Sequence, residues 1–375
     1  MPANQRQKAG EMDSKMPSQR GNFAIFIAAL ALLLCLGLGS VSQPAFAGKK
    51  PDPAPKIDPA TLVWPMPPDK PRVRFIEEWD NNLQVEPIRK RTWADKLAGV
   101  PEKNVAEDFG KPAGIATDSR GRVYIVSVGR AVLYVIDREK KLLLRINGDN
   151  GVYFRSPVGI VIDEKDNVFI SDSQLHLVMK FNPQMRMVAN FGSDEGMQTP
   201  AYMALDEQRH RLYIADTRAQ AVFVYDPETL ALIRKVGKFG SKKDDEFQYP
   251  VGVAVNRNDG SFAITDTGSC SVRIFDANFK FVRRFGQQAM SPGNFVRPKG
   301  IAFDSEGNIW VADAAFNNFQ IFDPAGHVRM FVGSPGIGPG QFQLPNGLYI
   351  DKNNRVYVGD QLNGRVQVFQ FLGSK

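Results

Sequence analysis

One motif recurs along most of this 375-residue chain and constrains its fold more than any other feature. The motif is a proline followed, after one residue, by a glycine and a short apolar strand, and it returns every 43 to 50 residues. Six prolines start it: Pro112, Pro157, Pro200, Pro250, Pro298 and Pro345, the third without its glycine. Between them lie short strand-like runs and turn residues, with no helical pattern. A repeat of this length made of short strands is typical of a β-propeller, in which each repeat forms one four-stranded blade.

The sequence therefore predicts an all-β, six-bladed propeller over residues 71–375. Five repeats end in a fourth strand, at residues 142–146, 187–191, 232–236, 281–285 and 328–332, whereas the sixth has only three strands. Residues 71–79 form a lone predicted strand ahead of the repeats. We expect this N-terminal strand to be the fourth strand of blade six, closing the ring and covering sheet edges.

A charged insert, residues 81–108, separates this strand from blade one. It contains a short predicted helix with Thr92 as N-cap and Gly99 as its stop. Two interpretations stay open: the insert caps one face of the propeller, or it is a surface excursion.

The first 47 residues have the layout of a secretory signal peptide. A polar, basic start is followed by an apolar run over residues 23–38 and by Ala45-Phe46-Ala47, which predicts cleavage after Ala47. We expect an exported protein of a bacterial periplasm or cell envelope. The alternative is an uncleaved anchor, residues 23–42, in the inner membrane, and it gives the only predicted membrane contact.

Residues 48–70 are rich in proline and predict an extended linker. The portion from Trp64 to Pro68 has a second interpretation, docking on the propeller, because a free linker seldom carries a tryptophan.

Charge and cysteine content narrow the partners and the chemistry. The net charge of +7 is spread along the chain, without the dense basic block or the aromatic–basic pattern of a nucleic-acid site. Cys35 lies in the apolar run and leaves Cys270 alone in the exported body, so no disulfide is expected. We expect Cys270 to be inert because no histidine lies near it in the sequence.

Each repeat carries the same structural residues. An aromatic or methionine three residues before the proline is predicted to wedge between blades, at Phe109, Phe154, Met197, Phe247, Phe295 and Phe342. An aspartate ends the first strand and is predicted to bond its own turn, at Asp118, Asp163, Asp206, Asp304 and Asp351.

A second set of aspartates ends the second strand of five blades, with Ser127 in blade one. We expect these carboxylates at the mouth of the central channel, where they form either a metal site or, by the favoured interpretation, a repeated structural contact. They are Asp172, Asp216, Asp266, Asp313 and Asp360.

These repeats resemble NHL repeats, over about residues 109–371. Blade six matches the pattern most fully, with Pro345, Gly347, Asp351, Asp360, Asn363 and Arg365 in place. The resemblance implies the propeller fold and does not fix an activity. The turns after the second strand depart from the pattern differently in each blade, and we predict binding residues there: Arg130, Gln174, Arg218, Asn317 and Asn363.

Three classes of function follow. The favoured one is a non-catalytic binding or scaffolding protein that presents one face to a protein, peptide or glycan, with no cofactor. The alternative is a metal-dependent lyase, lactonase or other hydrolase with calcium or zinc in the channel, as in some propellers related to the NHL family. The chain's three histidines, His176, His210 and His327, fall at different levels, so a three-histidine zinc site is not expected. Nucleic-acid binding, known in some NHL domains, is disfavoured by the export signal.

Overall fold

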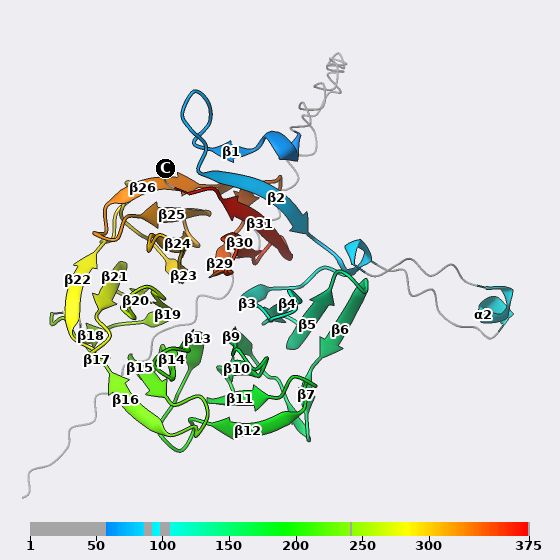
Figure 1. The fold of residues 1–375 in the computed structure, drawn as a ribbon, viewed down its shortest axis with the longest axis horizontal. Coiled ribbons are helices and arrows are strands. Elements are labelled where there is room, and N and C mark those ends of the chain that lie inside the picture. The colour runs from blue at the N-terminus through cyan, green and yellow to red at the C-terminus, as the bar shows by residue number, and fades with distance from the viewer. Residues whose placement is uncertain (1–57, 86–91, 98–105, 241, 374–375) are drawn as a thin grey trace, which may run out of the picture. The chain divides into compact units, whose positions relative to one another are not determined.

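A computed structural model describes residues 58–85, 92–97, 106–240 and 242–373 of the chain. Strands between residues 63 and 371 form six main sheets, which are arranged as a ring with the first strand of each repeat innermost (Figure 1), and three further two-stranded sheets. The inner strands of neighbouring blades contact one another around the whole ring, blade six against blade one included. The predicted all-β, six-bladed propeller is confirmed.

The first three blades are four-stranded antiparallel sheets, with register shifts in each of them. Blade one contains β3 (Pro112–Thr117), β4 (Val123–Ser127), β5 (Val132–Asp137) and β6 (Leu142–Ile146). Blade two contains β9 (Pro157–Ile162), β10 (Val168–Asp172), β11 (Leu177–Phe181) and β12 (Met187–Phe191). Blade three contains β13 (Pro200–Asp206), β14 (Arg211–Asp216), β15 (Ala221–Tyr225) and β16 (Leu232–Val236).

Blades four and five follow the same order. Blade four contains β19 (Pro250–Val255), β20 (Phe262–Asp266), β21 (Ser271–Phe275) and β22 (Phe281–Phe285). Blade five contains β23 (Pro298–Phe303), β24 (Ile309–Asp313), β25 (Asn318–Phe322) and β26 (Val328–Val332). All five predicted fourth strands have the predicted bounds.

Blade six takes its outer strands from the N-terminal side of the chain. Its own strands are β29 (Pro345–Ile350), β30 (Arg355–Asp360) and β31 (Arg365–Phe371). Strand β2 (Val73–Trp79) pairs antiparallel with β31, and the short β1 (Val63–Trp64) pairs with β2. Figure 1 shows β2, in blue, beside β31, in dark red.

The described end of the proline-rich segment packs on blade six. The indole ring of Trp64 meets the ring of Phe369 edge-on, with 5.8 Å between centroids, and a 3-10 helix, Pro59–Thr61, precedes β1. The contact of Trp64 is the one expected if residues 64–68 dock on the propeller. The predicted signal peptide or anchor and residues 48–57 lie outside the described residues. Within the described ranges, no helix is long and apolar enough to cross a bilayer.

The connections between blades carry short additional pairs of strands. Strands β7 (Gly148–Asp149) and β8 (Val152–Tyr153) are antiparallel. The pairs β17 (Lys238–Phe239) with β18 (Glu246–Phe247), and β27 (Ser334–Pro335) with β28 (Gln341–Phe342), are parallel. The insert has a 3-10 helix, Asn82–Gln84, and the short helix α2, Trp93–Leu97, at the predicted place. The proposed stop at Gly99 lies outside the described residues.

Six apolar clusters fill the gaps between neighbouring blades, and each contains one predicted wedge residue. These residues are at most 5% exposed, and they are Phe109, Phe154, Met197, Phe247, Phe295 and Phe342. Burying a phenylalanine contributes roughly 1.5–3 kcal/mol, so the wedges join the blades into one core.

The close approach of the next blade explains the glycine that stands two positions after the starting proline in five blades. A Cβ at Gly347 would lie 1.7 Å from the backbone oxygen of Ala113, and one at Gly159 would lie 2.4 Å from that of Ala201. The inner strands therefore approach too closely for any side chain at these two positions. Blade three has Tyr202 at the equivalent place, and its hydroxyl is buried without a hydrogen-bond partner among the described residues.

Candidate functional site

The two faces of the propeller are built from different connections. One face carries the turns between second and third strands, together with the connections from each fourth strand to the next blade. We call it the loop face. The opposite face carries the remaining turns, and we call it the turn face. All five predicted binding residues and all five second-strand aspartates belong to the loop face.

The second-strand aspartates hold the loop face together from inside. All five are 0% exposed: Asp172, Asp216, Asp266, Asp313 and Asp360. The carboxylate of Asp172 accepts hydrogen bonds from the backbone N–H groups of Arg155 and Ser156, which come before the inner strand, and from those of Gln174 and Leu175 in its own turn. Such a carboxylate has its lone pairs occupied by the protein.

The aspartates of the other four blades are also held by the protein, two of them through the same contacts and two with the help of an arginine. Asp216 and Asp313 each accept four backbone N–H groups in the same pattern. Asp266 accepts two backbone N–H groups and pairs with the buried Arg273 at 2.9 Å, and Asp360 accepts one and pairs with Arg365 at 2.9 Å. These contacts support the structural interpretation of the aspartates. Among the described residues, no three His, Cys, Asp or Glu side chains are grouped so as to hold a metal ion.

Blade one lacks the aspartate and secures its turn in another way. Ser127 accepts only the backbone N–H of Arg130, at 3.3 Å. The guanidinium of Arg130 pairs with Asp108 at 2.5 Å and with Glu107 at 3.0 Å. The hydrogen bond from Arg130 lowers the pKa of Asp108. Arg130, predicted as a binding residue, is therefore tied to the end of the insert.

The other four predicted binding residues divide into two pairs. Gln174 and Arg218 are exposed, and neither side chain makes a hydrogen bond or ion pair among the described residues. Asn317 accepts the backbone N–H of Leu344 at 2.9 Å, and Asn363 donates to Asp360 at 2.7 Å. The two asparagines thus support neighbouring loops, whereas Gln174 and Arg218 face solvent. The five side chains share a face without converging on one pocket.

Exposed apolar side chains, which the sequence analysis missed, mark the interblade connections of the same face. They are Tyr153, Phe239, Met290 and Ile337, exposed by 60, 71, 81 and 75%. Tyr249 and Leu362, exposed by 47 and 56%, lie nearer the inner strands. The available signal was an apolar residue inside a polar glycine-rich loop.

Lys299 is a second residue that the sequence analysis missed. It follows the starting proline of blade five, where the other blades carry Ala113, Val158, Ala201, Val251 and Asn346. Its ammonium lies 5.9 Å from the centroid of the Tyr249 ring. Burial, reinforced by the nearby charge of Arg297, lowers the pKa of Lys299.

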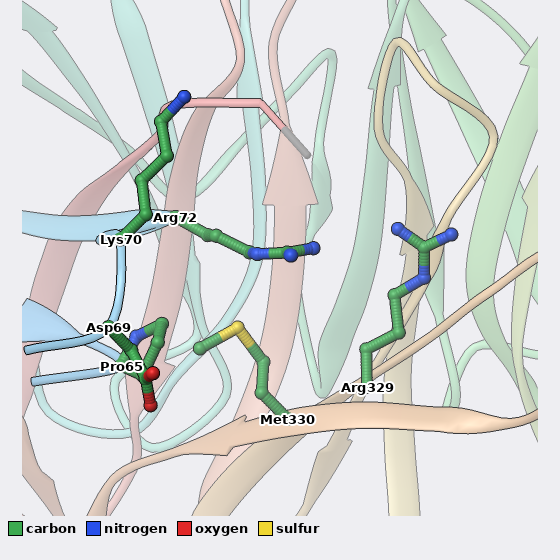
Figure 2. Close-up of a pocket in the computed structure, with 6 residues that line it drawn as sticks. All are labelled: Pro65, Asp69, Lys70, Arg72, Arg329 and Met330. Carbon is green, nitrogen blue, oxygen red and sulfur yellow. The ribbon is translucent and has the colours of Figure 1, made fainter. Parts of the chain in front are cut away.

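A hollow of about 480 Å³ lies away from this face, at the outer edge of blades five and six. It is lined by Pro65, Asp69, Lys70, Arg72, Arg329 and Met330, as Figure 2 shows. Its walls come from the β1–β2 connection and from β26, and it is open, with charged residues at four of its six lining positions. This hollow gives no arrangement suited to catalysis.

The histidines and the cysteine do not form a site with one another. His176 is exposed on the loop face, whereas His210 and His327 are exposed on the turn face. His176 therefore lies on the opposite face from the other two, and His210 and His327 belong to turns of different blades, three and five. Cys270 is 6% exposed, and burial raises the pKa of its thiol.

Comparison with known proteins agrees with this architecture. The chain is a six-bladed β-propeller that contains NHL repeats. The NHL repeat family matches residues 247–275, 295–322 and 342–369, which belong to blades four, five and six. In sequence, the chain is 31% identical over 127 residues to the protein brain tumor of Drosophila melanogaster; the match covers 33% of this chain and 11% of that protein.

Solved structures share the fold at low identity. A virginiamycin B lyase from Staphylococcus aureus matches with a TM-score of 0.52 and 10% identity, covering 71% of this chain and 97% of that one. A protein of unknown function from Bacteroides thetaiotaomicron matches with a TM-score of 0.55 and 15% identity, covering 78% of this chain and 76% of that one. At these identities the likeness concerns the fold alone.

Proposed function

We propose that this chain is an exported, non-catalytic binding protein of the cell envelope, and that its loop face holds a protein, peptide or glycan. One observation carries the proposal. Apolar side chains that are more than half exposed lie in four interblade connections, which all belong to the loop face. Exposed apolar groups gathered on one face are characteristic of interaction surfaces. The rigid ring behind them would hold such a surface ready for a partner.

The alternative, a metal-dependent lyase or hydrolase in the channel, has less support. Each second-strand carboxylate is buried and hydrogen-bonded by the protein itself, so a metal ion there would displace structural contacts. Elemental analysis of the purified chain, with its melting temperature measured with and without EDTA, tests this alternative. About one equivalent of bound calcium or zinc and a lower melting temperature in EDTA would favour the enzyme.

Site-specific crosslinking in living cells tests the binding proposal. A photoreactive benzophenone amino acid replaces Phe239 or Ile337 on the loop face, or Lys352 or Asn278 on the turn face. We expect discrete adducts from the first two positions and none from the matched second two. Equal adducts from both faces, or none from either, would contradict the proposal.

A further inference from the structure

The mouth of the central channel on the loop face has an unusual set of charges. We define the channel mouth as the turns after the second strands, together with the two residues before and the one residue after each starting proline. None of these residues is acidic, and the second strands that lead into the turns end in the five buried aspartates described above. The basic side chains of the mouth are Lys111, Arg130, Arg155, Arg218, Arg297 and Lys299.

Five of these six cations have no anionic partner within the described chain. Only Arg130 forms an ion pair, with Glu107 and Asp108. Two of the aspartates are neutralised by buried arginines, Asp266 by Arg273 and Asp360 by Arg365. A molecule that approaches the mouth therefore meets five cations without an ionic partner among the described residues, and the accessible carboxylates beside the mouth, Glu107 and Asp108, are both paired with Arg130. Other acidic residues of this face, such as Asp194 and Asp244, belong to the longer connections outside the mouth.

Lys299 is the most constrained of these cations. Its backbone oxygen accepts the hydroxyl of Thr265 of blade four at 2.6 Å, which fixes the start of β23. Its side chain is half-buried, and the nearby charge is the like charge of Arg297. A half-buried cation beside a second cation is unfavourable until an anion joins it.

The apolar groups around the mouth select the kind of anion. Tyr249 lies beside the Lys299 ammonium, Leu362 follows the second strand of blade six, and Ile337 stands in the connection before blade six. Nucleic acids and sulfated glycans offer little for aliphatic side chains such as these. A polypeptide with acidic and apolar side chains would satisfy both features, since interfaces combine an apolar centre with charged contacts.

From this arrangement we propose that the channel mouth binds a polypeptide segment rich in acidic and apolar side chains, with Lys299 and Arg297 contacting its carboxylates. This proposal rests on the proposed function and names the partner's chemistry. Long-range attraction between exposed charges weakens with salt, so binding falls as ionic strength rises.

Selection from a random peptide library displayed on phage tests the proposal, because such a library contains peptides of every composition from which the channel mouth can select. The full chain and its Arg297→Gln/Lys299→Gln variant are panned in parallel, with Lys352→Gln on the turn face as the matched control. We expect peptides enriched in Asp or Glu together with Leu, Ile, Phe or Tyr. Their affinity, measured by fluorescence anisotropy, should fall roughly tenfold or more in the double variant and stay unchanged in the control.

A second readout does not depend on the stability of the variant. An amine-acetylating reagent is applied to the unmodified chain with and without a selected peptide, and each lysine is quantified by mass spectrometry. We expect the peptide to protect Lys299 and not Lys352. Peptides without acidic bias, equal binding to the double variant, or tighter binding of heparin or an oligonucleotide would overturn the proposal. Loop-face crosslinks obtained together with such a result would leave the proposed function standing and remove only this inference.

Discussion

Blades six and one are neighbours in the ring, yet they secure the turn after the second strand by opposite means. In blade six, the fully buried Asp360 accepts the backbone N–H of Gln343 and bonds the side chains of Asn363 and Arg365. In blade one, Ser127 replaces the aspartate, and the exposed Arg130 pairs with the end of the insert. The same turn is therefore held by a buried ionic network in one blade and by a surface ion pair in the other.

The comparison indicates which of the two turns contributes more to the stability of the loop face. Removing one partner of a buried ion pair leaves an uncompensated charge, whereas exposed pairs contribute little. Arg365 also bonds Glu78 of β2 and three backbone oxygens between β27 and β31, so the network of blade six joins several segments. We expect blade six to be far more sensitive than blade one to changes at this turn.

The largest effect is expected for Asp360→Ala. The substitution removes the fully buried partner of the 5%-exposed Arg365, which keeps the partly exposed Glu78, and it frees the backbone N–H of Gln343. We expect a loss of about 3–5 kcal/mol in the free energy of unfolding. Urea denaturation followed by tryptophan fluorescence measures it. A loss below about 1 kcal/mol would show that the network is not the anchor of this blade.

The junction between the two blades gives the next effect. Gly347→Ala would place a Cβ 1.7 Å from the backbone oxygen of Ala113, so an inner strand must shift. We expect a cost of about 1–3 kcal/mol or more in the free energy of unfolding. The matched control is Gly338→Ala, where the nearest atom to a new Cβ is a flexible Gln341 side-chain oxygen at 3.2 Å. Equal stabilities of the two variants would mean that blades six and one are less closely packed than described.

Ser127→Ala tests how much the turn of blade one depends on the serine that replaces the aspartate. The variant loses the acceptor for the backbone N–H of Arg130. It loses no buried ion pair of the kind that Asp360 forms in blade six. We expect a loss of about 1 kcal/mol in urea denaturation, well below that of Asp360→Ala. A loss as large as that of Asp360→Ala would remove the distinction between the two blades.

Much of this architecture could be predicted from the sequence, because it depends on local repetition. The proline period placed the inner strands, and the apolar runs gave the bounds of the fourth strands. The wedge residues were identifiable because each precedes its proline by three positions. The pairing of Arg130 with Asp108 could not be predicted, since it joins a turn to the end of a non-repeated insert.

The same reasoning explains what was missed at the candidate site. A lysine after the starting proline of blade five was visible in the sequence, but its significance depends on Tyr249 and Arg297, which the fold brings to the same mouth. The exposure of Phe239 or Ile337 depends on how each connection bends. The sequence repeat predicts the strands and blades. The contacts and exposure of the side chains that differ between blades depend on the folded ring, so the repeat does not predict them.

The smallest effect is expected for Arg130→Ala, and its dependence on pH and salt tests the comparison most directly. Both partners are exposed, so we expect about 0.2–1 kcal/mol at low salt and less at high salt. The pKa of Asp108 is lowered by the hydrogen bond from Arg130. The stabilisation is therefore present above the ordinary carboxylate pKa and is lost as the pH falls through the lowered value. Thermal denaturation of both proteins across acidic pH should show a difference at neutral pH that disappears in acid. A difference that persists in acid and in high salt would mean that Arg130 acts through packing, and that blade one has an anchor other than its ion pair.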